Sequence, residues 1–289
     1  MVESATSEPS ADPGPTAEIS DLRELQLVEL GILLDVQRAC EELGIEFFLG
    51  EGTLLGAVRH QGFIPWDDDI DLLMRRSEYE RFLRLAPPLL APKYTVQHAS
   101  TVADYWSPVI KVRLVEGEQR FRQTHIAHLT PDNGPLVDIF PLEYVPRPGG
   151  LTLRLQSTYI RVLRGLLVHK LRTKPADNWQ RRLMRAVGRI LPTGLLHHQL
   201  QWAHTLHGSG ERPYLASLAT YHPLGNQVMP SSCFAHPVSL SFEGHAMPVP
   251  VGFDRVLTTT YGDYRQVPPP ADRQIRHEFT RIPATDRSR

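Results

Sequence analysis

The sequence has little cysteine and no long apolar run, and each absence excludes a class of protein. Its two cysteines, Cys40 and Cys233, lie far apart and give neither a disulfide framework nor a zinc-ligand spacing. This usage fits a reducing compartment. No stretch approaches the roughly 18 consecutive apolar residues that a spanning helix needs. With 41% apolar residues the chain has enough to form a core. We therefore expect a cytoplasmic protein, with peripheral membrane attachment as an open addition.

The net charge is close to zero. The 31 Lys and Arg nearly balance the 32 Asp and Glu, which argues against nucleic acid as a partner. This balance hides a local asymmetry, because residues 147–189 contain eleven basic residues and one acid, Asp177. Residues 1–19, rich in Ser, Pro and acids, are predicted to be a disordered acidic tail and not a signal peptide.

Apolar periodicity and turn residues predict a small mixed sheet with flanking helices and a helical insertion. Helices are expected at about 21–43, 53–59, from 77 onward and at 253–261. Strands are expected at about 45–49, 70–74, 93–97, 107–115, 136–140, 238–242 and 246–249. The fold class is α/β or α+β, with the strand order open. The predicted parts are a catalytic core (20–145), a basic helical insertion (146–212) and a C-terminal part that completes the catalytic domain (213–289).

The acidic stretch FIPWDDDIDLL, residues 63–73, is the most informative segment. Four carboxylates within five residues, flanked by apolar side chains, repel one another unless a cation compensates. On a strand, Asp69 and Asp71 share a face while Ile70 faces the core. Two carboxylates on one face suit Mg²⁺. An exposed acidic turn is the alternative, and Asp67 and Asp68 are either outer groups of the site or part of a solvated loop.

Two further segments favour a phosphate and metal site. Residues 48–53 (FLGEGT) predict a strand, a small-residue turn and a helix start, where backbone N–H groups can approach a phosphate. Asp138 stands alone in the apolar strand 136–140. A buried carboxylate needs either a cation or a hydrogen-bond network, so a structural Asp bonded to nearby backbone is the alternative.

Several other side chains are candidates for the same site. Arg59 could reach a donor phosphate or simply end its helix, while Lys111 and Arg113 share a strand face and could bind phosphate. Trp66 could stack on a base or on a choline group by cation–π attraction, or anchor the loop. Weaker candidates for the acceptor side are Tyr261, Asp263, Tyr264 and His277.

The basic segment 147–189 leaves two interpretations open. Its leucines alternate with Arg and Lys, as in a helix that lies on an anionic membrane surface. The alternative is a soluble helical insertion with a charged outer face. The apolar residues concerned are Leu151, Leu153, Leu155, Ile160, Leu163, Leu166, Leu167 and Leu171.

Together, these motifs resemble the nucleotidyltransferase superfamily and, more closely, the LicD family of phosphocholine and alditol-phosphate transferases, which includes fukutin-related enzymes. GEGTLLGAVRHQGFIPWDDDID, residues 50–71, is similar to that family's signature nearly throughout. LRELQLVELGILLDVQRAC, GPLVDIFPLE and PVPVGFDRVLTTTYGDYRQVPPP are similar to it as well. The resemblance covers roughly residues 22–145 and 246–277.

The resemblance implies a metal site and a phosphate-side turn. Asp69, Asp71 and Asp138 match the family's catalytic, metal-binding carboxylates, and the implied metal is Mg²⁺ or Mn²⁺. Gly50, Gly52 and Thr53 match the turn. One departure is Glu51, because many superfamily members have Gly or Ser there.

The implied function is metal-dependent transfer of a substituted phosphate, of the phosphocholine or alditol-phosphate type. The donor is a CDP-activated alcohol and the acceptor is a hydroxyl on a glycan or glycolipid of the cell envelope. One alternative is a nucleotidyltransferase that moves a nucleoside monophosphate to a small molecule. Another is a non-catalytic relative that retains the nucleotide- and metal-binding pocket.

Overall fold

A computed structural model describes residues 15–103, 105–115, 121–123, 130, 132–171, 178–208, 212–220, 222–273 and 279–281, without the side chains of 15–20 and of Asp272. The long first helix, α1, spans Pro15–Leu43, so it begins before residue 21, the predicted start. Proline is well tolerated as a first helical residue. Gly44, with φ of +60°, ends the helix as expected. The predicted disordered tail covers residues 1–19, but the structure places residues 15–19 in α1, and residues 1–14 lie outside the described residues.

The central sheet contains both parallel and antiparallel pairs, and the structure gives the strand order that the sequence leaves open. Its strands run in the order β1–β2–β6–β4–β3, and β7 and β8 continue it from the far end of β6. Only β2 and β6 are parallel among these neighbours. The strands are β1 (Phe48–Leu49), β2 (Asp71–Arg75), β3 (Tyr94–Gln97), β4 (Ile110–Leu114), β6 (Leu136–Val145), β7 (Tyr214–Ala216) and β8 (Val228–Pro230).

Helices and a hairpin cover this sheet. Helix α1 packs on β4 and β6, α3 on β2 and β6, and α2 lies between β2 and strand β9. Strands β5 and β11 form a small separate pair. These elements are α2 (Glu51–His60), α3 (Arg76–Leu85), α4 (Pro87–Leu90), β5 (Phe121–Gln123), β9 (Pro237–Phe242), β10 (His245–Pro250), α8 (Phe253–Tyr261), β11 (Phe279–Arg281) and the 3₁₀ turns Leu224–Asn226, Ser231–Phe234 and Pro270–Asp272.

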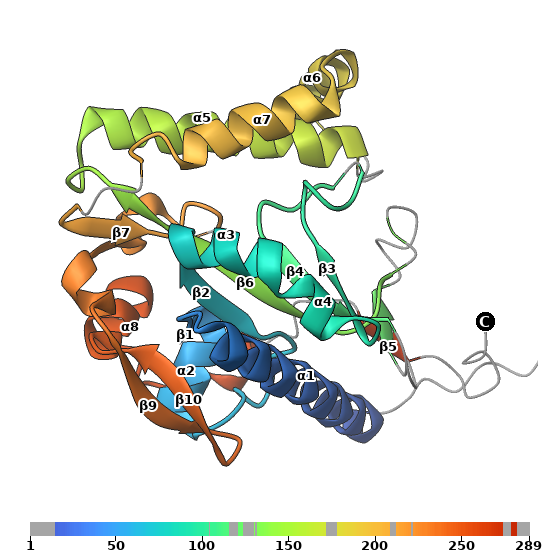
Figure 1. Cartoon of the computed structure of the whole chain (residues 1–289), viewed down its shortest axis with the longest axis vertical. Helices are drawn as coiled ribbons and strands as arrows, with labels where there is room; N and C mark the ends of the chain where they lie inside the picture. Colours follow the sequence, from blue (N-terminus) through green and yellow to red (C-terminus); the bar gives the residue numbers. More distant parts are fainter. Residues whose placement is uncertain are drawn as a thin grey trace, which may run out of the picture.

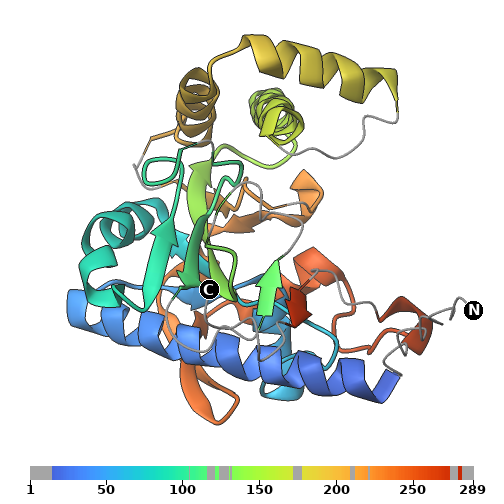
Figure 2. The ribbon, with the colours of Figure 1, turned by 90° about the vertical axis from the view of Figure 1, so that its right-hand side faces the viewer.

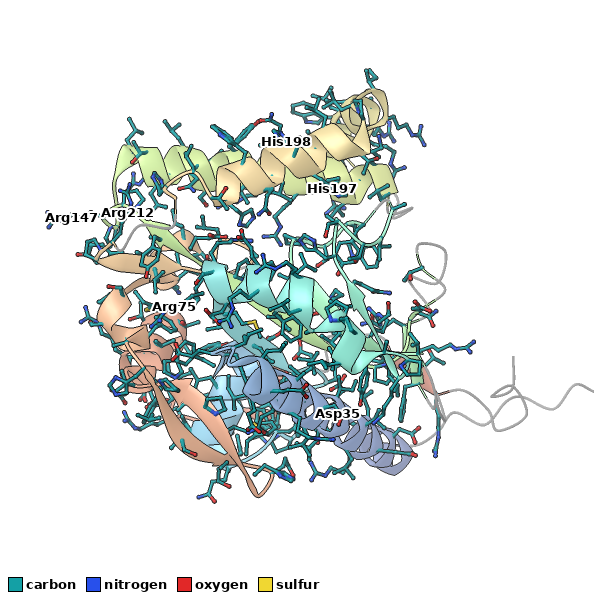
Figure 3. The ribbon with its side chains drawn as sticks, viewed as in Figure 1. Asp35, Arg75, Arg147, His197, His198 and Arg212 are labelled. Atoms are coloured by element: carbon teal, nitrogen blue, oxygen red, sulfur yellow. The ribbon has the colours of Figure 1, made fainter. Side chains whose placement is uncertain are left out.

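Helices α5 (Leu151–Leu171), α6 (Trp179–Ile190) and α7 (Thr193–His204) form a layer of their own. Figures 1 and 2 show this insertion layer at one end of the molecule, with α6 crossing outermost. Figure 3 labels one residue of α1, Asp35, and two residues of α7 in the insertion layer, His197 and His198. The predicted break near 192–194 is confirmed, whereas the one near 173–177 lies outside the described residues. None of the described helices is long and apolar enough to cross a membrane.

The insertion layer has its own core, which corrects the sequence-based view of its leucines. Leu153, Ile160, Leu163 and Leu167 are buried against α7 and the β6–β7–β8 end of the sheet. They are therefore not available to a membrane, because every third or fourth position of α5 faces inward. Leu151 and the residues at its helical spacing face outward instead.

Candidate active site

Three neighbouring strands place two carboxylates and one amine in a single row. Asp71 at the start of β2 pairs in register with Asp138 on β6, and Lys111 on β4 pairs with Asp138 from the other side. Lys111 Nζ lies 2.6 Å from both carboxylate oxygens of Asp138. The Asp138 amide donates to the carbonyl of Ile70 at 2.8 Å. The parallel β2–β6 pairing is thus what brings together two acids that lie far apart in the sequence.

The acidic loop adds three more carboxylates. Ligand atoms of Asp67, Asp68 and Asp69 lie within 4.8 Å of one another, and Asp68 is buried. Strand β2 begins only at Asp71, so Asp69 lies in the loop, and the strand alternation by which Asp69 and Asp71 were predicted to share a face does not extend to Asp69. The loop is held from α1, where the Gln26 amide donates to the Asp67 carbonyl at 2.8 Å. Asp67 and Asp68 are therefore parts of the cluster and not solvated bystanders.

The turn before α2 approaches this loop closely. A Cβ on Gly52 would lie 2.5 Å from Asp67 Oδ2, so a larger residue there would force that carboxylate to move. The Gly50 amide donates to the Asp71 carbonyl at 2.9 Å, and the Thr53 hydroxyl accepts from the Asp71 amide at 2.8 Å. Gly50 and Thr53 thus hold β2 in position. The first N–H groups of α2, including that of Gly52, have no acceptor within the helix and are the groups that an anion would bind.

The charge distribution suits a hard divalent cation. Burial, followed by the charges of Asp69 and Asp138, raises the pKa of Asp71 well above its ordinary value. A bound cation would stabilise the ionised form of such a carboxyl group against the surrounding negative charge. Carboxylate oxygens are the ligands that Mg²⁺ and Mn²⁺ prefer. The carboxylates of the Asp67–Asp69 loop, with Asp71 and Asp138 on the neighbouring strands, are thus of the chemical type that such an ion binds.

Two basic candidates have other partners in this structure. The guanidinium of Arg113 is fully buried and donates to Gln97, Gln123 and the carbonyl of Gly134, so the prediction that it binds phosphate is wrong. Lys111 shares its strand, but it reaches Asp138, and its predicted contact with a donor phosphate stays a prediction.

Arg59 and Trp66 tie the site to the C-terminal segment. Arg59 donates to the carbonyls of Tyr264 and Gln266 at 3.1 and 3.2 Å. The guanidinium of Arg273 lies 4.8 Å from the centre of the Trp66 ring. One face of the indole is thus covered by a protein cation, which favours the anchoring interpretation of Trp66 over stacking on a ligand.

Tyr261 and His222 border the acids from the C-terminal part. His222 Nε2 lies 3.0 Å from Glu51 Oε2, and the rings of His222 and Tyr261 meet edge-on at 5.5 Å. Burial and the charges of Glu51 and Asp71 raise the pKa of Tyr261, so it stays a neutral hydroxyl. Glu51 has a φ of +43°, a left-handed conformation that glycine adopts more easily. His277 lies outside the described residues.

Sequence reasoning missed the polar residues of α1. Gln26 and Glu29 are both buried, although they belong to the helix that was predicted only as an apolar face. A signal was available, because they stand three residues apart on the same face as Leu33 and Val36. Polar side chains in the middle of a buried helical face need partners inside the fold.

Two cavities lie elsewhere in the described structure. One, of about 240 Å³, lies between α7, the start of α3 and the segment that joins β3 to β4, and is lined by Arg76, His98 and His204. The other, of about 500 Å³, lies between the end of α1 and the β9–β10 hairpin. Neither is lined by the acidic residues, whose chemistry identifies the site better than cavity size does.

These residues form an acidic cluster on a mixed α/β sheet, beside the N-terminus of α2. The model of the family described as LicD/FKTN/FKRP, nucleotidyltransferase domain, matches residues 44–152, which include the turn, the acidic loop and Asp138. The chain belongs to the LicD family.

Two relatives illustrate the extent of the match. The chain is similar to the lipopolysaccharide cholinephosphotransferase LicD of Haemophilus influenzae, with 31% identity over 261 residues that cover 89% of this chain and 96% of the relative. An uncharacterised protein of Rickettsia typhi is 35% identical over 80 residues, which cover 28% of this chain and 25% of that protein. The first match spans both the acidic site and the insertion layer.

Proposed function

We propose that this protein is a metal-dependent transferase that moves phosphocholine, or a similar substituted phosphate, from a CDP-activated alcohol to a hydroxyl of a cell-envelope glycan. The observation that carries the proposal is the register of Asp71 with Asp138 beside the acidic loop. The similarity to the Haemophilus cholinephosphotransferase over nearly the whole chain supports the choice of reaction.

Asp69, Asp71 and Asp138 would hold a Mg²⁺ or Mn²⁺ ion, which supplies neutralisation of the phosphate charge. The Gly52 end of the turn would receive a donor phosphate at the N-terminus of α2. The acceptor oxygen bonds to the phosphorus that carries the choline, and the bond from that phosphorus to the bridging oxygen breaks, releasing CMP. Asp138 is the group proposed to accept the proton of the acceptor hydroxyl.

The test is a transfer assay with CDP-choline and a lipopolysaccharide-type glycan, following CMP release and the new phosphodiester by ³¹P NMR. We expect Asp71→Asn to lower the rate at least about 100-fold while the protein remains folded. Asp132→Asn, a change outside the acidic row, serves as the matched control. Full activity of the Asp71 variant would refute the assignment.

The competing reaction is transfer of a nucleoside monophosphate. It would consume CTP and release pyrophosphate, whereas the proposed reaction releases CMP from a CDP-alcohol. Incubation with CTP and with CDP-choline in parallel therefore separates the two. Mg²⁺-dependent binding of donor without turnover on any acceptor would instead favour a non-catalytic relative.

We further propose that the insertion layer rests on an anionic bilayer, where a glycolipid acceptor would be met. Three helices expose apolar residues at helical spacing. On α6, Trp179 and Ile190 are 71% and 82% exposed. These outward-facing apolar residues are Leu151, Leu155, Tyr159 and Val162 on α5, Trp179, Leu183, Val187 and Ile190 on α6, and Leu195 and Trp202 on α7.

The stripes on α5 and α7 form one surface, and its charge complements anionic lipid. The rings of Tyr159 and Trp202 meet at 6.4 Å across the two helices. No acid occurs in the sequences of α5, α6 and α7, while exposed arginines such as Arg154, Arg161 and Arg189 flank the apolar stripes. Apolar side chains bordered by arginine are typical of helices that lie in a membrane interface.

The membrane proposal is tested by co-sedimentation of the full chain with vesicles of phosphatidylcholine, with and without phosphatidylglycerol. We expect binding only to the anionic vesicles, with a blue shift of tryptophan emission. The double variant Leu155→Ser/Ile190→Ser should lose it, whereas Leu89→Ser, an exposed position on α4, should not. Self-association through this surface, without vesicle binding, would overturn the proposal.

A further inference from the structure

Helix α1 carries a carboxylate that the structure leaves without a partner. Glu29 is completely buried, and within the described part of the chain neither of its Oε atoms has a hydrogen-bond partner. Burying a carboxylate without a hydrogen-bond donor is energetically unfavourable, so such a group requires an explanation. Its neighbours supply one.

The surroundings of Glu29 are the acids of the candidate site. Burial, followed by the charges of Asp69, Asp68 and Asp67, raises the pKa of Glu29 well above its ordinary value, and Asp138 adds to this. One turn of α1 earlier, Gln26 donates to the carbonyls of Ile64 and Asp67, so this part of α1 packs directly on the acidic loop.

Among the described residues, no Lys, Arg or His forms an ion pair or a hydrogen bond with Glu29. The guanidinium of Arg113 is near enough for the two charges to attract, but its hydrogen bonds go to Gln97, Gln123 and Gly134. Lys111 is committed to both oxygens of Asp138. A fully buried carboxylate without a hydrogen-bond partner, on a helix that packs on a loop of three carboxylates, is chemically suited to a cation.

We propose that Glu29 is a further carboxylate of the cation site, which it completes from α1 together with the Asp67–Asp69 loop. This inference rests on the proposed function, because it concerns the same site. It adds a residue outside the segment that the family model matches, and it makes α1 a part of the site and not only a cover of the sheet. The α1 carboxylate would then fix the loop only when the cation is bound.

The test is Mn²⁺ binding to the full chain without donor, measured by electron paramagnetic resonance, combined with thermal unfolding. We expect Glu29→Gln to weaken Mn²⁺ affinity at least about tenfold. Without metal, this variant should unfold at a higher temperature than the wild type, because it removes buried like-charge repulsion. Glu42→Gln, at an exposed position of the same helix, should change neither quantity.

Unchanged Mn²⁺ affinity in Glu29→Gln overturns the inference. If Asp71→Asn abolishes binding in the same assay, only the role of Glu29 fails; if neither variant affects binding, the proposed metal site fails with it. Glu29→Asp keeps the carboxylate but shortens the side chain by one methylene, and this variant replaces Glu29→Gln in the test if the latter does not fold. Weakened affinity is again the expected result, and wild-type affinity the contrary one.

Discussion

A buried ion pair joins helix α3 to strand β6 beside the end of α7, and breaking it should be costly. Arg76 at the start of α3 donates from Nε to Glu143 Oε2 on β6 at 3.2 Å, and a second bond joins its other nitrogen to Oε1. The two side chains are only 10% and 3% exposed. His204 at the end of α7 places Nδ1 3.6 Å from the same carboxylate. Arg76→Met removes the charge and keeps most of the apolar stem.

The expected loss follows from the carboxylate left behind. Removing one partner of a buried pair costs about 3–5 kcal/mol, because the other charge stays buried and uncompensated. For a protein of this size that corresponds to a fall in the unfolding midpoint of roughly 6–20 °C. Circular dichroism during heating measures it. Arg38→Met, which breaks the exposed pair with Asp35, should cost only about 0–1 kcal/mol.

The cost should also depend on pH. Burial opposes ionisation of Glu143, but the contact with His204 and the charge of Arg76 outweigh it and lower its pKa. Burial lowers the pKa of His204, which is therefore neutral in the wild type. Without Arg76, either Glu143 or His204 can take up a proton to relieve the lone charge. The stability difference between wild type and Arg76→Met should thus be smaller at pH 6 than at pH 8.

A second substitution separates loss of charge balance from loss of packing. Arg76→Met/Glu143→Met replaces the pair by apolar side chains of similar length and should recover most of the stability, since buried pairs and apolar replacements are often nearly equivalent. A double variant as unstable as the single one would mean that shape and not charge dominates here. A cost below about 1 kcal/mol for Arg76→Met would refute the reasoning altogether.

Two further predictions concern the site. Lys111→Met leaves Asp138 without its amine, so the free energy of unfolding of the metal-free protein should fall by about 1.5–3 kcal/mol. The rise in unfolding midpoint on adding Mg²⁺ should become larger than in the wild type. An unchanged response to Mg²⁺ in thermal unfolding would contradict this prediction. Gly52→Ala puts a methyl group against Asp67 and should weaken Mg²⁺ binding by about tenfold in calorimetry, or about 1.4 kcal/mol. Gly31→Ala, where a Cβ meets nothing within 4 Å, should leave Mg²⁺ binding unchanged, and an equal loss there would contradict the steric argument.

The elements of this fold could be predicted from local sequence, but their pairing could not. Strands near 70–74, 93–97 and 136–140 and the helices at 53–59 and 253–261 were confirmed, because turn residues and periodicity are local signals. The order β1–β2–β6–β4–β3 depends on contacts between distant segments, which periodicity does not encode. The strand predicted at 70–74 is observed at Asp71–Arg75, so the alternation argument for Asp69 and Asp71 fails at Asp69, since element boundaries are the least defined feature of such patterns.

The same distinction between local and tertiary signals holds for the candidate site. The acidic loop, the turn and Asp138 were recognisable by residue type, and the register of Asp71 with Asp138 explains why they belong together. Arg113 was misassigned because alternation along a strand says which face a residue shares, but not whether that face is covered. The position of Gln26 and Glu29 on the apolar face of α1 signals their burial, but a helical pattern does not indicate which loop packs on that face.

The distance between the acidic row and the insertion layer leads to a last prediction. Strands β2 and β6 run in parallel from Asp71 and Asp138 toward Glu143, where the insertion layer is attached. Five residues of strand span roughly 16 Å, and a layer of helices adds about 10 Å. With the apolar stripes on a bilayer, the acids would therefore stand well above the lipid headgroups.

A lipid-linked acceptor must then reach them through several sugar units, so transfer to vesicle-embedded glycolipids should rise steeply with glycan length. The same glycans free in solution should show no such dependence, and equal rates on short and long membrane-bound acceptors would contradict the proposed orientation.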